Sequence, residues 1–83
     1  MTTLTLIGKP GCHLCDDARA VIDAVLAERP HVRLDERSIL DDPALAATYA
    51  EEIPVVLIDG RQHSYWHVDA ARLSAALDAA ATV

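Results

Sequence analysis

The sequence lacks the features that mark membrane-spanning and secreted proteins. It has no uninterrupted apolar stretch of about 18 residues, the length that a membrane-spanning helix needs. Residues 1–7 carry no basic flank and form too short an apolar run for a signal peptide, so we expect a cytoplasmic protein. With 83 residues there is no room for a separate cofactor domain. We therefore expect residues 1–83 to form one domain.

Basic residues are scarce as well. Seven Lys and Arg residues stand against 13 Asp and Glu residues, which gives a formal net charge of −6. Such an excess of negative charge repels polyphosphates and anionic lipid headgroups. We therefore expect no nucleic-acid partner and no membrane partner, and any protein partner should present a basic or neutral face. The short chain and its single-sign charge favour a monomer.

Cysteine is limited to two residues, Cys12 and Cys15, in a Cys-x-x-Cys spacing. In a reducing compartment a lone pair of this kind indicates either redox catalysis or half of a metal site. Residues i and i+3 lie on one face of a helix, where they can form a disulfide with little strain. A first cysteine at a helix start also lies beside free N–H groups and the positive end of the helix dipole, which favours the thiolate. We therefore predict Cys12 as the nucleophile and Cys15, one turn into the helix, as the less exposed thiol that resolves the mixed disulfide.

Periodicity in the first half of the chain predicts two strands and a helix. A short apolar run at residues 3–7 indicates a buried strand that stops at Gly8. Apolar residues then recur at helical spacing over residues 12–28, and Pro30 ends this helix. Residues 31–36 alternate apolar and charged side chains, which is typical of a half-exposed strand at a sheet edge.

The second half predicts a helix, a hairpin and a last helix. Asp42 before Pro43 is a helix start signal, and this helix should run to about residue 50. The unbroken apolar run at residues 54–58 indicates a strand covered on both faces, and Asp59-Gly60 predicts a tight turn to a returning strand at residues 61–65. A helix opening at about residue 69 should face inward through Leu73, Ala76, Leu77 and Ala80.

The predicted order is strand, helix, strand, helix, strand, strand, helix. A helix between the first two strands implies a parallel pair with a right-handed crossover, and the hairpin makes the last two strands antiparallel. The sequence therefore predicts an α/β fold with a mixed four-stranded sheet that is flanked by helices.

These features together resemble a glutaredoxin, the smallest version of the thioredoxin fold. The Cys-x-x-Cys follows the first strand, and Ile53-Pro54 opens the third. Residues 10–18 and 42–55 are similar to a small glutaredoxin-like branch that reads Pro-Gly-Cys-x-Leu-Cys-Asp-x-Ala and, later, Asp-x-x-Leu-x-x-x-Tyr before Ile-Pro-Val. The resemblance covers about residues 3–77. It implies a β-α-β-α-β-β-α fold and a thiol-disulfide oxidoreductase that holds no cofactor beyond a redox-active Cys12–Cys15 disulfide.

The resemblance also implies a substrate site around the cysteines. Pro54 would be a cis proline that faces both thiols, and the Ile53 backbone would then turn outward to pair with an extended substrate or with glutathione. Lys9 matches the basic position of the family, and Asp69 falls near its acidic position. The predicted partners are a disulfide-containing protein target and a reductase.

Two departures from the family concern glutathione. Leu14 stands where dithiol glutaredoxins typically carry an aromatic residue, and the segment at residues 65–69 replaces their Gly-Gly-x-Asp. Both family features are used on glutathione, so their absence argues against it as the physiological reductant. The tail is more similar to glutaredoxin-like electron donors of ribonucleotide reductase, which are reduced by thioredoxin reductase. The residues leave both electron sources open.

Several side chains near the cysteines have two interpretations. His13 as a cation would stabilise a thiolate, whereas the neighbouring Asp16 and Asp17 oppose a second anion, and a merely exposed His13 is equally compatible with the sequence. Lys9 either attracts a carboxylate or a thiolate, or is a solvated loop residue. Leu14 suits an apolar contact with a protein target. Trp66 either joins a partner-binding rim or fills the core of a chain that has no Phe.

Two rival functions remain at this stage. The cysteines with His13, His63 or His67 would supply four zinc ligands, but His13 is held between the thiols and no second Cys pair is present. An iron–sulfur cluster that bridges two chains is the other form of metal binding. A non-catalytic interaction module of the same fold is the second rival.

Overall fold

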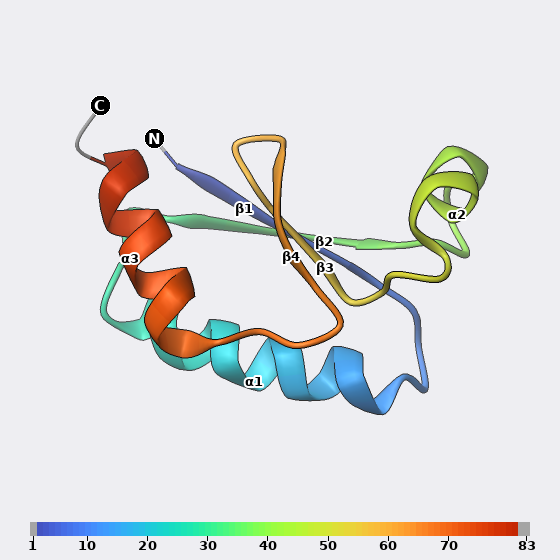
Figure 1. Cartoon of the computed structure of the whole chain (residues 1–83), viewed down its shortest axis with the longest axis horizontal. Coiled ribbons are helices and arrows are strands. Elements are labelled where there is room, and N and C mark those ends of the chain that lie inside the picture. Colours follow the sequence, from blue (N-terminus) through green and yellow to red (C-terminus); the bar gives the residue numbers. More distant parts are fainter. Residues whose placement is uncertain (1, 82–83) are drawn as a thin grey trace.

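The computed structural model describes residues 2–81 and contains the seven elements in the predicted order (Figure 1). They are β1 (Thr3–Gly8), α1 (His13–Ala27), β2 (Arg33–Ser38), α2 (Pro43–Tyr49), β3 (Val55–Ile58), β4 (Arg61–Tyr65) and α3 (Ala70–Ala81). Within this described part of the chain, no helix is both long and apolar enough to cross a bilayer.

The strands form one mixed sheet in the order β2-β1-β3-β4. β1 pairs parallel to β2 and antiparallel to β3, and β3 pairs antiparallel to β4. This confirms the predicted mixed sheet and places the charged strand β2 at an edge. Two positions in the hairpin turn, Asp59 with φ 50° and Gly60 with φ 85°, have the positive dihedrals that a tight two-residue connection needs.

Strand β2 begins and ends two residues later than the predicted 31–36. The chain is still turning after α1 at this point, because the Val32 N–H donates to the Arg29 carbonyl at 3.0 Å. Sheet pairing starts with the Arg33 N–H, which donates to the Thr2 carbonyl at 2.9 Å, and continues until Ser38 pairs with Gly8. The alternation of residue types predicted that this strand exists. It did not predict the first residue of the strand, which depends on the pairing with β1.

Helices α1 and α3 lie on one side of the sheet, and α2 lies near one end of the other side (Figure 1). The core between the sheet and helices α1 and α3 is made of apolar side chains from β1, β3, α1 and α3, together with Val32: Leu4, Leu6, Ala18, Ile22, Val25, Val32, Val56, Leu73 and Leu77. Leu73 and Leu77 are fully buried, as predicted, whereas α2 buries no residue. This packing fixes α1 against β1. The junction of these two elements carries the cysteines.

The helices begin at capping residues that the sequence signals. Asp42 Oδ1 accepts the N–H groups of Ala44 at 2.9 Å and Leu45 at 3.4 Å, with Pro43 as the first residue of α2. Capping of this kind satisfies N–H groups that have no partner inside the helix. The start of α2 is therefore encoded locally, which explains why it was predicted to the residue.

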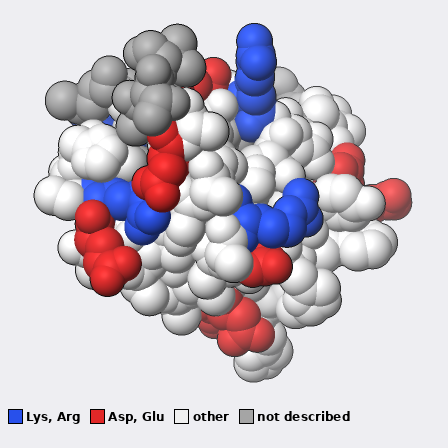
Figure 2. All heavy atoms as spheres, turned by 60° about the vertical axis from the view of Figure 1, so that its left-hand side comes forward, with Lys and Arg blue, Asp and Glu red and all other residues white. Residues whose placement is uncertain are grey.

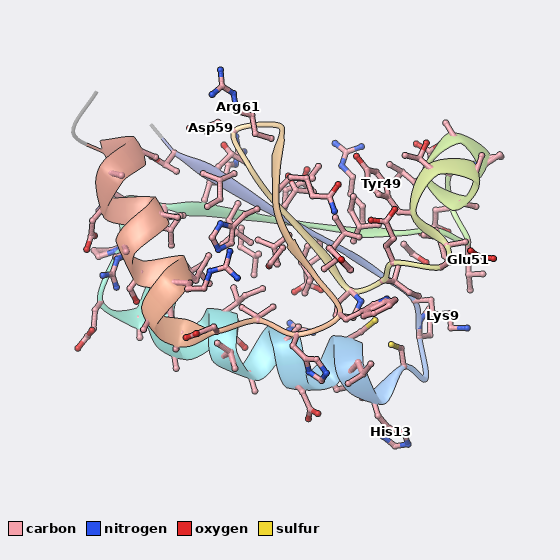
Figure 3. The ribbon with its side chains drawn as sticks, viewed as in Figure 1. Lys9, His13, Tyr49, Glu51, Asp59 and Arg61 are labelled. Atoms are coloured by element: carbon pink, nitrogen blue, oxygen red, sulfur yellow. The ribbon has the colours of Figure 1, made fainter. Side chains whose placement is uncertain are left out.

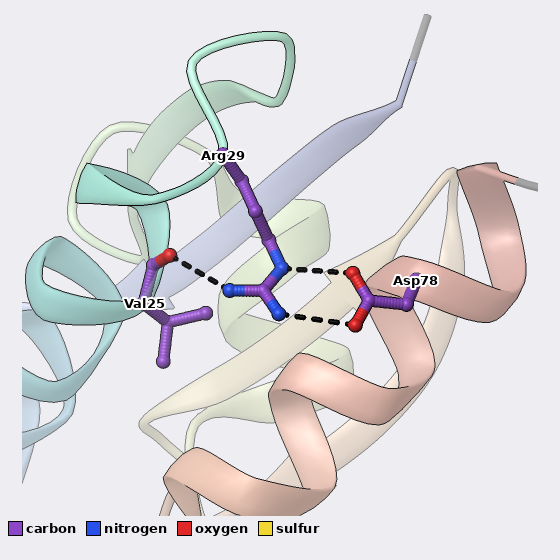
Figure 4. Close-up of polar contacts among 3 residues, drawn as sticks. All are labelled: Val25, Arg29 and Asp78. Carbon is purple, nitrogen blue, oxygen red and sulfur yellow. Dashed lines mark hydrogen bonds and ion pairs between the residues drawn. The ribbon is translucent and has the colours of Figure 1, made fainter.

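An ion pair joins the end of α1 to α3 (Figure 4). Arg29 donates through Nε and Nη2 to the two carboxylate oxygens of Asp78, at 3.0 and 3.1 Å, and through Nη1 to the Val25 carbonyl at 3.1 Å. The hydrogen bond from Arg29 lowers the pKa of Asp78 below its usual value.

Basic and acidic side chains are interspersed on the face that Figure 2 shows, which brings the left-hand side of Figure 1 forward.

Replacing Asp78 should test this link. Asp78→Asn is expected to lower Tm by a few degrees at neutral pH, because it removes a bidentate pair that connects two helices. The pKa of Asp78 is lower in the folded chain than the value of about 3.9 for an unperturbed Asp, so its stabilisation is present above that pH and is lost as pH falls through the folded pKa. The Tm difference between the two proteins, measured by circular dichroism, should therefore shrink towards pH 3.

Asp23→Asn is the matched control for this experiment. Asp23 lies 3.9 Å from Arg19 in an exposed i,i+4 pair within α1. Pairs of this kind contribute little to stability, so its Tm should stay close to that of the wild type. Equal Tm losses in the two variants would contradict a special role for the Arg29–Asp78 pair.

Candidate functional site

Cys12 caps the N-terminus of α1. Its backbone is extended, with φ −96° and ψ 114°, and its Sγ accepts the Cys15 N–H at 3.2 Å. The preceding Gly11 has φ 76°, which lets the chain turn sharply into the helix. An N–H donor and the helix dipole both stabilise a thiolate more than a thiol. The half-buried Cys12 is thus reachable from solvent and is placed as a nucleophile requires.

Cys15 is the buried member of the pair. Both cysteines are free thiols, and only 7% of Cys15 is exposed. Burial, followed by its hydrogen bond with Cys12, raises the pKa of Cys15 to about 11, although a backbone hydrogen bond with Lys9 opposes this rise. Cys15 is therefore a protonated thiol near neutral pH. Figure 3 shows the sulfur atoms together at the N-terminal end of α1.

Gly8, at the end of β1, packs directly against Cys15. A Cβ atom added to Gly8 would lie 2.9 Å from the Sγ of Cys15 and 3.2 Å from its Cβ, closer than real contacts allow. The sequence indicated only that the strand stops at this glycine. The requirement for a residue without a side chain comes from the approach of α1, which no local pattern shows.

Gly8→Ala should therefore destabilise the dithiol form. We expect the free energy of unfolding to fall by about 1–3 kcal/mol, the usual cost of overpacking, measured by urea denaturation. In a Cys15→Ala background, which removes the sulfur, the same substitution should cost less. An identical cost in both backgrounds would show that Gly8 and Cys15 do not share this contact.

The Ile53–Pro54 peptide is cis, as the resemblance implied. Pro54 is fully buried, and Ile7 of β1 pairs with Val55 of β3. Gly8 and Pro54 are the next residues beyond this pair on the two strands, and Gly8 packs against Cys15, so Pro54 lies at the end of the sheet that carries the cysteines. Within residues 2–81, no hydrogen bond is formed by the N–H or the carbonyl of Ile53. Its peptide groups are open to a partner.

Apolar side chains surround this end of the molecule. Leu14 is 39% exposed, Tyr65 49% and Trp66 50%. The rings of Tyr65 and Trp66 meet edge to face with centroids 5.1 Å apart, and Trp66 and Leu14 line a small cavity of about 70 Å³. Trp66 therefore does not fill the core, but it does contact the protein, because its ring packs against Tyr65 while half of the residue's surface is exposed to solvent.

The side chains of the other predicted site residues either extend into solvent or have a structural role. Lys9 and His13 are exposed, and both side chains point away from the sheet (Figure 3). Asp69 Oδ1 accepts the N–H groups of Ala71 at 2.9 Å and Arg72 at 3.5 Å, so it caps α3. Substrate binding by Lys9, His13 and Asp69 stays a prediction.

A pocket that the sequence did not predict lies on the other side of Cys15. It has a volume of about 380 Å³ and lies between the loop after β1, the first turns of α1 and the end of β2. Cys15 and Arg19, one helical turn apart, both line it, and Arg19 Nε lies 3.1 Å from Glu36 Oε1. In the sequence, only the i,i+4 spacing of Cys15 and Arg19 indicated that these two side chains share a face of α1 and could line one pocket. This pocket brings polar groups close to the buried thiol.

The histidines of the zinc alternative are not gathered around the cysteines. His63 and His67 line a different pocket beside Tyr65 and Arg72, and His13 points away from the sheet. Among residues 2–81 there is no group of three or more His, Cys, Asp or Glu side chains that could hold a metal ion. The geometry gives no support to a metal site within this part of the chain.

Comparison with known proteins gives a consistent result. A model of the glutaredoxin-like domain (DUF836) matches residues 3–78. An uncharacterised protein of Mycobacterium tuberculosis is 34% identical over 74 residues, which cover 84% of this chain and 76% of that protein. The crystal structure of the structural-genomics target XcR50 from X. campestris is 38% identical with a TM-score of 0.69, covering 92% of this chain and 96% of that one. Chloroplastic thioredoxin z shares 13% identity with a TM-score of 0.81, covering 100% and 80%, a likeness of fold alone.

Proposed function

Because the chain belongs to the glutaredoxin-like domain family, we propose that it is a thiol-disulfide oxidoreductase that reduces target disulfides with Cys12 and Cys15. The observation that carries this proposal is the asymmetry of the pair. Cys12 caps a helix and is reachable from solvent, while Cys15 is buried one turn further and donates its N–H to the Cys12 sulfur. A reactive thiol with a protected thiol behind it is the arrangement that a two-step exchange needs.

The proposed reaction has two steps. The Cys12 thiolate attacks one sulfur of the target disulfide, a Cys12–target disulfide forms, and the other target sulfur leaves as a thiolate that takes a proton. Cys15 then loses its proton and attacks the Cys12 sulfur, which forms the Cys12–Cys15 disulfide and releases the second target thiol. Two electrons pass from the chain to the target, and a reductase must return two electrons before the next cycle.

We expect the target to be a protein. Leu14 and Trp66 offer exposed apolar surface beside Cys12, and the excess of acidic residues favours a target with a basic or neutral face. A reducing compartment such as the cytoplasm would keep the dithiol form available. Thioredoxin reductase and the glutathione system are the two candidate electron sources.

Insulin reduction tests the proposed function directly. With dithiothreitol as the electron source, the chain should accelerate insulin precipitation well above the rate with dithiothreitol alone. Protein alkylated with iodoacetamide in its reduced form serves as the control and should give no acceleration. Failure of the untreated chain to exceed dithiothreitol alone would overturn the proposal and favour a non-catalytic module. Replacing dithiothreitol by glutathione with its reductase, or by thioredoxin reductase, then identifies the electron source.

A further inference from the structure

Trp66 connects the end of β4 to the loop that leads into β3. Its indole Nε1–H donates to the Glu51 carbonyl at 3.0 Å. Its backbone N–H donates to the Pro54 carbonyl at 2.9 Å and, at 3.3 Å, to the Glu52 carbonyl. Trp66 thus donates to three of the four carbonyls in the segment of residues 51–54. We call these three hydrogen bonds the loop clamp.

The carbonyl that the loop clamp leaves out belongs to Ile53. Neither polar backbone group of Ile53 has a hydrogen-bond partner within residues 2–81, although its neighbours on both sides are held. Pro54 and Gly8 are the next residues beyond the Ile7–Val55 pair, and Gly8 packs against Cys15. The hydrogen bonds from Trp66 therefore fix the open Ile53 peptide at the end of the sheet that carries the cysteines.

The backbone of Trp66 indicates that the indole is held there at a cost. Trp66 has φ 64°, in the left-handed region, which is strained for a residue with a side chain. Glycine would adopt this conformation freely, but it would supply no indole N–H and no ring. The hydrogen bond to Glu51 and the edge-to-face contact with Tyr65 offset the cost.

Trp66 also lies across a cavity from the helix that carries the thiols. Trp66, Leu14 and Ala18 line this small cavity between the chain after β4 and the first turns of α1. Trp66 thus holds the loop of residues 51–54 by hydrogen bonds and faces the start of α1, the two elements between which a target segment would lie.

We propose that Trp66 is a positioning residue whose loop clamp holds the Ile53 peptide open for main-chain pairing with an extended polypeptide, so that the chain prefers disulfides within polypeptides over small disulfides. This inference rests on the proposed oxidoreductase function. A small disulfide needs only Cys12, whereas an extended segment also needs Ile53 at the correct distance. The clamp would thereby determine the class of substrate.

The test compares insulin with hydroxyethyl disulfide in wild-type protein and Trp66→Phe. Phenylalanine keeps an aromatic ring but cannot donate to Glu51, and the loss of a hydrogen bond worth about 1 kcal/mol corresponds to about fivefold. We expect the ratio of kcat/KM for insulin to kcat/KM for hydroxyethyl disulfide to fall about fivefold, mainly through KM for insulin. Trp66→Gly, which keeps the backbone N–H and loses the ring, should lower the ratio further.

Leu40→Ala is the control variant, since Leu40 is 70% exposed and lies in the turn after β2. It should leave the ratio unchanged. If Trp66→Phe proves unstable in a thermal melt, replacement of Trp66 by benzothienylalanine, which keeps the bicyclic shape without the N–H, gives the same comparison. Equal changes for both substrates, or no change for either, would overturn the positioning role. Failure of the wild type on both substrates would instead overturn the proposed function.

Discussion

Cys12→Ser is expected to lower the rate of insulin reduction about a thousandfold or more. The serine hydroxyl stays protonated near neutral pH and cannot attack a disulfide, and the remaining thiol, Cys15, is 7% exposed with a pKa of about 11. The turbidity assay with dithiothreitol should therefore show no rate above background. Activity equal to that of the wild type would remove the main support for the proposed reaction.

Cys15→Ser completes this experiment because it should stop the reaction after its first step. Cys12 keeps its cap position and can still attack, but no second thiol lies one turn away to release the target. A stable covalent adduct with the target is expected, visible by mass spectrometry under non-reducing conditions and lost with dithiothreitol. An adduct that forms through Cys15 in the Cys12→Ser protein instead would reverse the assigned roles.

The resolving step is expected to accelerate about tenfold for each pH unit between pH 7 and pH 10. In the dithiol form burial, followed by the hydrogen bond with Cys12, raises the pKa of Cys15 to about 11. Burial, the largest cause, persists when Cys12 is in a mixed disulfide, so the Cys15 thiolate stays scarce at pH 7 and its fraction rises about tenfold for each pH unit until the pKa is reached. The overall gain over this range is about a thousandfold. It is measured on the mixed disulfide of Cys12 with nitrothiobenzoate, from the release of the coloured thiolate.

The same mixed disulfide in Cys15→Ser protein is the control, and it should release nitrothiobenzoate slowly at each pH. A wild-type rate that stops rising near pH 8 would show that Cys15 titrates well below the expected value.

Most of the fold follows from signals that are local in the sequence. The cap at Asp42 and the turn at Asp59-Gly60 are each satisfied by residues within a few positions, so the elements that they bound were predicted closely. Strand β2 has no such signal at its start. Its first residue depends on the Thr2 carbonyl, which is distant in sequence, and the prediction was wrong by two residues at each end.

The site also combines features that local sequence signals predict with features that depend on contacts between distant elements. The cysteine spacing predicted the helix cap, and the family resemblance supplied the cis bond before Pro54. The tight contact of Gly8 with Cys15 and the clamp by Trp66 depend on how distant elements meet, and no spacing in the chain encodes them. Asp69 caps α3, a local role that the family match did not indicate, and its predicted role in substrate binding stays a prediction.

The outer border of β2 affects how the molecule meets other chains. Among residues 2–81 this strand pairs only with β1, and its residues include Arg33, Asp35, Glu36 and Arg37. A border of alternating charges is a poor template for a strand from another molecule, so growth of the sheet into ribbons or aggregates is discouraged on that flank. Even at high protein concentration, the charged edge of β2 should therefore disfavour pairing with a strand from another molecule.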